Sequence, residues 1–263
     1  MRNPAVIARK AILNLGYAIE VARYRALRQL ARYRVLRQFK RYNILERYNV
    51  LHRFRLGIMS RRDRFSLAYQ DARWGSQESR SGTGSELRAT EVIRANLAPL
   101  LRRHNIRTLL DAPCGDWNWI QHVDLSGIEY FGADIVPAVV AANRKKYQAP
   151  NISFLEADLT RDALPRTEAI LCRDCLVHLS YQDISAILAN FRRTDATWLL
   201  VNTYPEIKAN RNQFTGIPWR RLNLQLPPFN FPPPIETLSD GGNVNPGQLA
   251  LWRLQELPEL VAH

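Results

Sequence analysis

Three short apolar segments of this sequence end in acidic residues. They are residues 109–111, 130–134 and 152–158, and they finish at Asp111, Asp134 and Asp158. Short apolar runs separated by helical patterns predict parallel strands of an α/β sheet, whose ligands bind just beyond the carboxyl ends of the strands. Three carboxylates at neighbouring strand ends predict a pocket that accepts hydrogen bonds from hydroxyl and amino groups and stabilises a positive charge.

The turn after the first run adds further polar groups. It reads Asp111-Ala112-Pro113-Cys114-Gly115-Asp116, and its glycine lets the backbone approach a ligand closely. Two of its acids also have a purely structural interpretation, with Asp111 capping the turn and Asp116 forming a helix N-cap. The combination of Asp111 with Asp134 and Asp158 favours a ligand pocket.

A second group of polar and reactive side chains lies at the end of the apolar run 169–173 and just after it. It comprises Cys172, Arg173, Asp174, Cys175 and His178. Asp174 and His178 are four residues apart, so in a helix they would share one face. His178 is the candidate general base because its unperturbed pKa lies near neutrality, with Asp174 as its catalytic neighbour. A histidine hydrogen-bonded into the strand-to-helix packing is an equally good interpretation.

The cysteines do not predict a disulfide framework. There are three of them, an odd number, which favours a reducing compartment. Cys114, Cys172 and Cys175 with His178 offer four metal ligands, but structural zinc sites usually take a Cys-x-x-Cys pair from a turn. This pair brackets the end of a strand, so we predict buried thiols and no metal.

The elements that position these residues follow from hydrophobic periodicity. It predicts helices near 119–123, at 136–147 and at 181–191, and another after a capping box of Thr83 and Glu86. Strands that alternate with helices indicate a doubly wound, mostly parallel α/β sheet. The strands are expected at 108–111, 129–134, 152–157, 169–173 and 197–203, with two more near 236–238 and 249–254 after a Pro-rich loop.

The first 64 residues differ in composition from the rest of the 263-residue chain. They hold 17 of the 37 lysines and arginines but three of the 24 acidic residues, a net charge of +14 that leaves the remainder near −1. The sequence Ala-Arg-Tyr-Arg-x-Leu-Arg-Gln occurs at 22–29 and again at 31–38. We therefore predict a basic, repetitive helical arm over 1–64, a flap or cap segment over 65–90 and an α/β domain over 91–263.

Several partners suit such an arm. Arginines interleaved with tyrosine and leucine fit an anionic membrane surface, and they also fit a nucleic acid. A solvated basic helix and an organelle transit peptide are the other interpretations. No apolar run is long enough to span a bilayer, so we expect a cytoplasmic protein, peripheral at a membrane if the arm binds one. The sequence does not indicate an oligomeric state.

In the order of these features the chain resembles the class I S-adenosylmethionine-dependent methyltransferases. The resemblance covers about residues 70–255, and the segments 111–116, 172–180 and 219–224 are similar to those of uncharacterised bacterial small-molecule methyltransferases. It implies a Rossmann-like sheet with a C-terminal antiparallel hairpin, and S-adenosyl-L-methionine as the cofactor of residues 91–263.

The resemblance also implies roles for individual residues. The 111–116 turn would lie against the cofactor, although only Gly115 falls on a family glycine and Pro113 and Trp117 replace the other two. Asp134 with Ile135 would hold the ribose hydroxyls, and Asp158 with Leu159 would lie at the adenine. Arg173 is expected to bind the cofactor's carboxylate or an acidic substrate.

The resemblance also indicates where the acceptor binds. Tyr204, Trp219, Arg220 and Asn223 follow the fifth strand, where acceptors dock in this family. No Asn-Pro-Pro-Tyr follows the fourth strand, which counts against methylation of an adenine or glutamine nitrogen. We expect an oxygen acceptor on a small molecule, a glycan or a lipid headgroup.

Three alternatives remain. Asp111-Ala112-Pro113-Cys114 is also the motif around the nucleophilic cysteine of RNA cytosine-C5 methyltransferases, but there it follows the fourth strand. A nicotinamide enzyme would need Gly-x-Gly-x-x-Gly after the first strand. A methyltransferase-like adaptor without catalysis is the non-enzymatic alternative.

Overall fold

The computed structural model of the chain describes residues 59–240 and 247–260. The chain divides into two compact units, residues 1–58 and 59–263, and every element below belongs to the second unit. The predicted helical arm therefore lies almost entirely outside the described residues. Residues 59–64, which composition assigns to that arm, belong to the second unit, because helix α3 (Arg61–Gln70) begins there.

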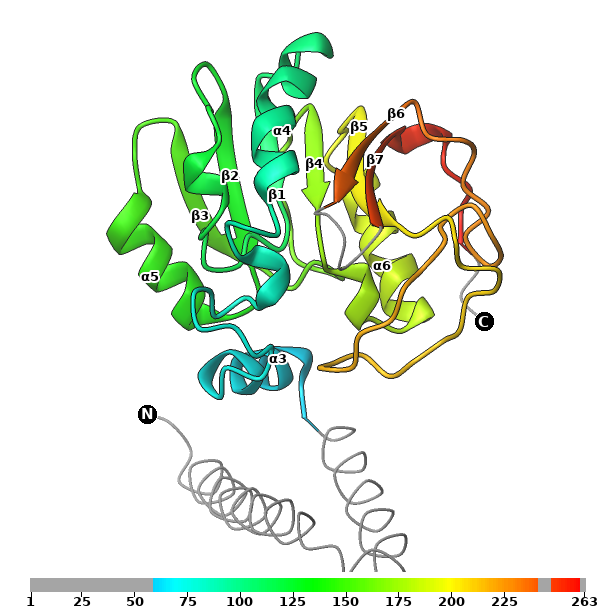
Figure 1. Cartoon of the computed structure of the whole chain (residues 1–263), viewed down its shortest axis with the longest axis horizontal. Coiled ribbons are helices and arrows are strands. Elements are labelled where there is room, and N and C mark those ends of the chain that lie inside the picture. The colour runs from blue at the N-terminus through cyan, green and yellow to red at the C-terminus, as the bar shows by residue number, and fades with distance from the viewer. Residues whose placement is uncertain (1–58, 241–246, 261–263) are drawn as a thin grey trace, which may run out of the picture. The chain divides into compact units, whose positions relative to one another are not determined.

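A seven-stranded sheet in the order β3-β2-β1-β4-β5-β7-β6 forms the centre of this unit (Figure 1). Strands β1 to β5 are parallel, whereas β7 is antiparallel to both β5 and β6. The predicted Rossmann-like α/β sheet with its C-terminal antiparallel pair is confirmed. The strands are β1 Thr108–Asp111, β2 Glu129–Asp134, β3 Ile152–Glu156, β4 Ala169–Cys172, β5 Trp198–Thr203, β6 Glu236–Asp240 and β7 Gly247–Arg253.

Helices cover both faces of the sheet. Leu109 of β1 packs in an apolar cluster with α4 (Glu91–Arg103) and α5 (Pro137–Tyr147). Its neighbour Leu110 points to the other face and packs in the cluster that contains α6 (Tyr181–Arg192). Burial on both faces explains why these strands are continuous apolar runs in the sequence.

Helix α3 lies beyond the carboxyl ends of the parallel strands (Figure 1). Ser60 caps it, since its Oγ accepts the backbone N–H of Asp63 at 3.1 Å. The cap fixes the point at which the chain enters the second unit, so the first helical residue, Arg61, is directed into the fold.

One predicted helix is wrong, and another begins later than predicted. The segment near 119–123 is a single 3₁₀ turn, Ile120–His122. The helix predicted after the capping box of Thr83 and Glu86 is present as α4, but it begins only at Glu91, and Thr83–Ser85 is a 3₁₀ turn. Glu78 explains the second case, because its carboxylate accepts the N–H of Leu87 at 2.8 Å and the amide of Asn118 at 2.6 Å, and these bonds fold the segment onto the β1–β2 connection.

Candidate functional site

A cavity of about 940 Å³ opens at the carboxyl ends of the parallel strands. Asp111, Asp134 and Asp158 all line it, so the three strand-end carboxylates share one crevice as the sequence analysis predicts. The other predicted residues in its wall are Pro113, Cys114, Gly115, Ile135, Leu159, Arg173, Asp174, His178 and Trp219. Ala112, which is completely buried, and Asp116 lie outside the lining.

Asp134 is held by backbone hydrogen bonds. Its Oδ2 accepts the N–H of Gly115 at 3.1 Å, and its Oδ1 accepts the N–H of Val136 at 2.9 Å. Burial raises the pKa of Asp134 to about 6, against the opposing effect of these hydrogen bonds. A buried carboxylate fixed at a strand end with acceptor positions left over suits a pair of adjacent hydroxyl donors.

Asp111 lies deeper, at the end of β1. Its Oδ2 accepts the hydroxyl of Tyr130 at 2.6 Å, and the residue is 3% exposed. Burial raises the pKa of Asp111 to about 7; the Tyr130 bond opposes this rise, and the negative charge of Asp134 adds to it. A carboxyl that ionises near neutrality is poised to respond to a cation placed in the cavity.

This shift predicts a pH-dependent stability. Because the folded-state pKa exceeds the roughly 3.9 of an exposed aspartate, the carboxyl stabilises the fold most when protonated, and this contribution is lost as pH rises from about 4 to 7. Asp111→Asn should therefore increase the free energy of unfolding at pH 8, by an amount on the order of 2 kcal/mol, and far less at pH 4. Denaturant titrations at both pH values measure this change, with the exposed Asp124→Asn as control. An equal gain of the Asp111→Asn variant at pH 4 and pH 8 would refute the prediction.

Asp158 differs from the other two acids because it is already paired. Its Oδ1 accepts the N–H and the hydroxyl of Thr160 at 3.1 and 2.7 Å, and its Oδ2 accepts Arg61 Nε at 3.2 Å. Burial acts to raise the pKa of Asp158, but the Thr160 hydrogen bonds and Arg61 outweigh it and hold that pKa below its usual value. Asp158 is therefore ionised at neutral pH.

The turn after β1 is locked by the segment before α4. Gly115 has a φ of +54°, and a Cβ there would lie 2.4 Å from Ser81 Oγ, which explains why glycine stands at this point. Asp116 accepts the hydroxyl of Ser79 at 2.9 Å and the N–H of Arg80 at 2.8 Å. Asp116 thus secures the predicted flap and lies outside the cavity lining.

Two other residues of this segment, Trp117 and Cys114, are buried. Trp117, at a φ of +60°, is buried against the rings of Tyr130, Tyr147 and Phe154, so its indole packs behind the turn instead of obstructing the cavity. Cys114 is 7% exposed, and burial raises the pKa of its thiol well above the usual value, helped by Asp134 and Asp111. A thiol of this kind is a poor nucleophile, which removes the support for the RNA cytosine-C5 chemistry.

Arg173 and Asp174 form a buried charge network at the end of β4. Arg173 donates Nε and Nη2 to Asp240 Oδ1 at 3.0 and 2.9 Å, and its Nη1 lies 3.1 Å from Asp174 Oδ2. Burial lowers the pKa of Arg173, but the two carboxylates outweigh it and keep that pKa above its usual value. With its donors directed to these acids, Arg173 positions Asp174 at the cavity wall.

His178 and Asp174 do not share a helical face. Asp174 has a φ of +52°, and Leu176–His178 is a 3₁₀ turn, so the predicted helical spacing is wrong although both residues line the cavity. Nδ1 of His178 lies 3.1 Å from the carbonyl oxygen of Pro218. A carbonyl only accepts, so Nδ1 carries the hydrogen and the lone pair of the neutral ring is on Nε2.

Of the four predicted acceptor residues, only Trp219 lines the cavity. Tyr204 is fully buried against Gly247 and Trp219. Arg220 donates to the carbonyl oxygens of Arg211, Val177 and Leu179, and Asn223 donates to those of Pro205 and Ile207. These three residues stabilise the loop after β5, and Arg221 lines the cavity instead.

One wall of the cavity was not among the predicted site residues. Phe65 and Tyr69 of α3, with Arg61 and then Trp74, line it from the side of the chain that precedes the sheet. The signal was present, since three aromatic residues stand within ten positions between the basic arm and the Ser/Gly-rich stretch. The predicted Gly/Ser flap does contribute, because residues 81–86 line the same cavity.

The described residues show no group of three or more His, Cys, Asp or Glu side chains suited to a metal ion. Cys172 and Cys175 are buried free thiols. Among the helices of the described ranges, none is long and apolar enough to cross a bilayer.

Comparisons with known proteins relate this chain to methyltransferases. The family described as a methyltransferase domain matches residues 109–195. Burkholderia thailandensis 1,6-didemethyltoxoflavin-N1-methyltransferase, solved with its substrate and S-adenosylhomocysteine, superimposes with a TM-score of 0.52 at 16% identity over 73% of this chain and 86% of that one. This likeness shows the fold.

Two further structures are similar over shorter stretches. Human N-acetylserotonin methyltransferase in complex with SAM has a TM-score of 0.45 at 15% identity over 62% of this chain. A bacterial CtHen1 methyltransferase domain has a TM-score of 0.40 at 16% identity over 44% of this chain. The chain spans 52% and 66% of their respective lengths. A search among curated protein sequences gives no significant match.

Proposed function

We propose that this chain, whose residues 109–195 match a methyltransferase domain, is a class I S-adenosylmethionine-dependent enzyme that methylates a hydroxyl oxygen of an aromatic small molecule. The observation that carries this proposal is the composition of the cavity wall. Phe65, Tyr69, Trp74, Trp119 and Trp219 line it together with His178. Aromatic side chains favour a flat ring through stacking and edge contacts.

The residues present fit the cofactor. The cavity of about 940 Å³ is at the upper end of the range for small-molecule sites, which leaves space for an acceptor beside a nucleoside. Asp134 would hold the ribose hydroxyls, Asp158 the adenine amine and Asp111 the positively charged end. When bound, S-adenosylmethionine supplies an electrophilic methyl group.

His178 is the proposed base. Its Nδ1–H is directed to the Pro218 carbonyl, which leaves Nε2 to take the proton of the acceptor hydroxyl as the oxygen becomes nucleophilic. Burial lowers the pKa of His178, against the opposing bond to Pro218, so the imidazole is neutral at physiological pH. We assign Asp174, which Arg173 holds through an ion pair at 3.1 Å, to orient the acceptor.

Product analysis tests this proposal. The full-length protein is incubated with S-adenosylmethionine and matched acceptors, namely phenols, their methyl ethers, anilines, sugars and phospholipid vesicles. We expect methyl transfer to phenols, with no product from the corresponding ethers. Transfer to anilines, sugars or lipids with phenols unchanged would contradict the aromatic-oxygen assignment while leaving the methyltransferase activity in place.

We also propose that the basic N-terminal segment binds an anionic membrane surface. Its support is the composition of residues 1–58, which hold 14 lysines and arginines against two acids (a net charge of +12), with arginine and tyrosine interleaved. Because Arg61 belongs to the cavity wall, the truncation should remove residues 1–58 only. Co-sedimentation with phosphatidylglycerol vesicles should be lost in this truncation; equal sedimentation of both forms would contradict the proposal, and binding to RNA alone would favour the nucleic-acid interpretation.

A further inference from the structure

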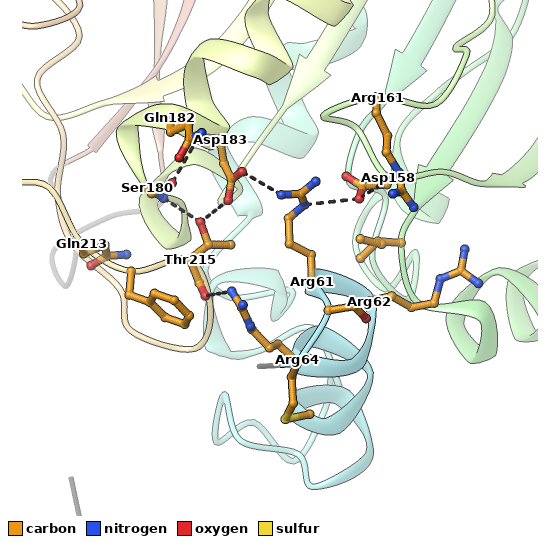
Figure 2. Close-up of a pocket in the computed structure, with 14 residues that line it drawn as sticks. Arg61, Arg62, Arg64, Asp158, Arg161, Ser180, Gln182, Asp183, Gln213 and Thr215 are labelled. Carbon is orange, nitrogen blue, oxygen red and sulfur yellow. Dashed lines mark hydrogen bonds and ion pairs between the residues drawn. The ribbon is translucent and has the colours of Figure 1, made fainter. Parts of the chain in front are cut away.

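Arg61 connects the first helix of the described chain to two separate parts of the fold. Figure 2 shows its side chain extending from α3 between Asp158, after β3, and Asp183, at the start of α6. Arg61 Nε lies 3.2 Å from Asp158 Oδ2, and Nη1 lies 2.9 Å from Asp183 Oδ1. Nη2 donates to the hydroxyl of Thr160 at 2.6 Å. All three nitrogens of the guanidinium are used.

The contacts close a ring around one side of Asp158. The Thr160 hydroxyl accepts from Arg61 and donates to Asp158 Oδ1 at 2.7 Å, and the Thr160 N–H donates to the same oxygen at 3.1 Å. Asp158 is therefore fixed from both its oxygens. Its own side chain is 8% exposed, so thermal reorientation would break bonds that water cannot readily replace.

An ionised carboxylate has about four acceptor positions. Three of those on Asp158 are held, two by Thr160 and one by Arg61, at 3.2 Å or less. The remaining contact is to Arg161 Nε at 3.5 Å, and the Arg161 side chain is 67% exposed. Such a long contact to a solvated side chain is worth little, so one acceptor position is left for a donor on a ligand.

Arg61 and Asp158 also line both neighbouring cavities, the one of about 940 Å³ and a second of about 530 Å³ between α3, the β3–β4 connection and residues 213–215. Asp183 lines only the smaller one. Arg61 thus pairs with Asp183, which lies outside the larger cavity, and at the same time holds Asp158 in the wall of that cavity.

Resting on the cofactor placement of the proposed function, we propose that Arg61 is a positioning residue for adenine recognition. It holds Asp158 in one orientation and ionised, so that its remaining acceptor position receives the exocyclic amine of the adenine. The helix that follows the basic segment is in this way a component of the cofactor site.

The test compares two ligands that differ at this amine. S-Inosylhomocysteine carries a carbonyl oxygen where S-adenosylhomocysteine carries the amine, and an oxygen facing Asp158 is repelled. Calorimetric titration of the full-length wild type should show strong preference for the adenine ligand. Arg61→Met should weaken S-adenosylhomocysteine binding by roughly tenfold or more, because Asp158 is no longer held in the orientation that accepts the hydrogen bond of the amine. The same substitution should change S-inosylhomocysteine binding less than about threefold.

Two further variants sharpen the comparison. Arg62→Met is the matched control, because Arg62 is the next residue of α3, pairs with Glu156 and lines only the smaller cavity; its ligand preference should equal that of the wild type. Arg61→Lys keeps the charge without the planar fork and should give an intermediate preference.

Three outcomes would overturn the proposal. Arg61→Met could retain the wild-type preference, or it could lose both ligands equally together with thermal stability, which would indicate a purely structural role. A folded wild type that binds neither ligand would overturn the proposed function and this inference together, and that result is distinct from the first two.

Discussion

Replacing Asp134 by alanine should weaken the binding of S-adenosylhomocysteine by about a hundredfold or more. Asp134 is a buried carboxylate at the end of β2, fixed by the N–H groups of Gly115 and Val136. Two ribose hydroxyls would donate to it, and each hydrogen bond to a charged group contributes on the order of 1.5–3 kcal/mol. Calorimetric titration of the full-length variant measures the loss directly.

Two companions separate the carboxylate's role from its effect on the fold. Asp134→Asn keeps an acceptor for one backbone N–H and should lose affinity less than the alanine variant, with a melting temperature closer to that of the wild type. Asp124→Ala removes an acid whose side chain is 57% exposed and pairs with Arg102 at the surface, so its affinity should not change. Equal weakening by the Asp124 variant would attribute the effect to overall charge.

Replacing His178 by glutamine should lower kcat by about 10²- to 10⁴-fold, the usual contribution of a general base. The KM for S-adenosylmethionine should change little, since His178 is assigned to the acceptor and not to the cofactor. Glutamine is close to histidine in size, and the Pro218 carbonyl lies at the accessible edge of the ring, so the loop after β5 should keep its conformation. Steady-state kinetics with the best phenol from the acceptor series provides the measurement.

The pH dependence gives the same prediction a second readout. Burial lowers the pKa of His178 below 6.5, against the opposing bond to Pro218, and a base must be deprotonated to act. The measurement uses saturating S-adenosylmethionine, so that the ionisation of Asp111 and Asp134 does not limit cofactor binding. The rate of the wild type should then rise with pH through a value below the usual pKa of histidine and stay level above it, and the His178→Gln substitution should abolish this rise. His122→Gln, an exposed histidine outside the cavity, serves as control. A wild-type rate that falls as pH rises across this range would rule out His178 as the base.

The strands and their acids were predictable because each signal is local. Residues 108–111 and 129–134 are strands with the predicted bounds, since both sheet faces are covered and the runs are apolar throughout. The meeting of Asp111, Asp134 and Asp158 then follows from parallel topology, which places the carboxyl ends of neighbouring strands at one edge.

The other features of the fold and the site were not predictable, because they depend on contacts between residues that are distant in the sequence. Nothing near Arg61 in the sequence indicates that it reaches Asp158 and Asp183, 97 and 122 residues further on. Glu86 resembled a capping residue, yet the hydrogen bonds of Glu78 decide how that segment folds. Arg220 and Asn223 have the side chains of ligand-binding residues, but loop carbonyls use their donors.

A crystal structure with S-adenosylhomocysteine tests the central assignment most directly. We expect one molecule in the cavity of about 940 Å³, with the ribose hydroxyls on Asp134, the adenine amine on Asp158 and the sulfur toward Asp174 and His178. A nucleoside bound outside this cavity, or within it with its ribose away from Asp134, would contradict the account.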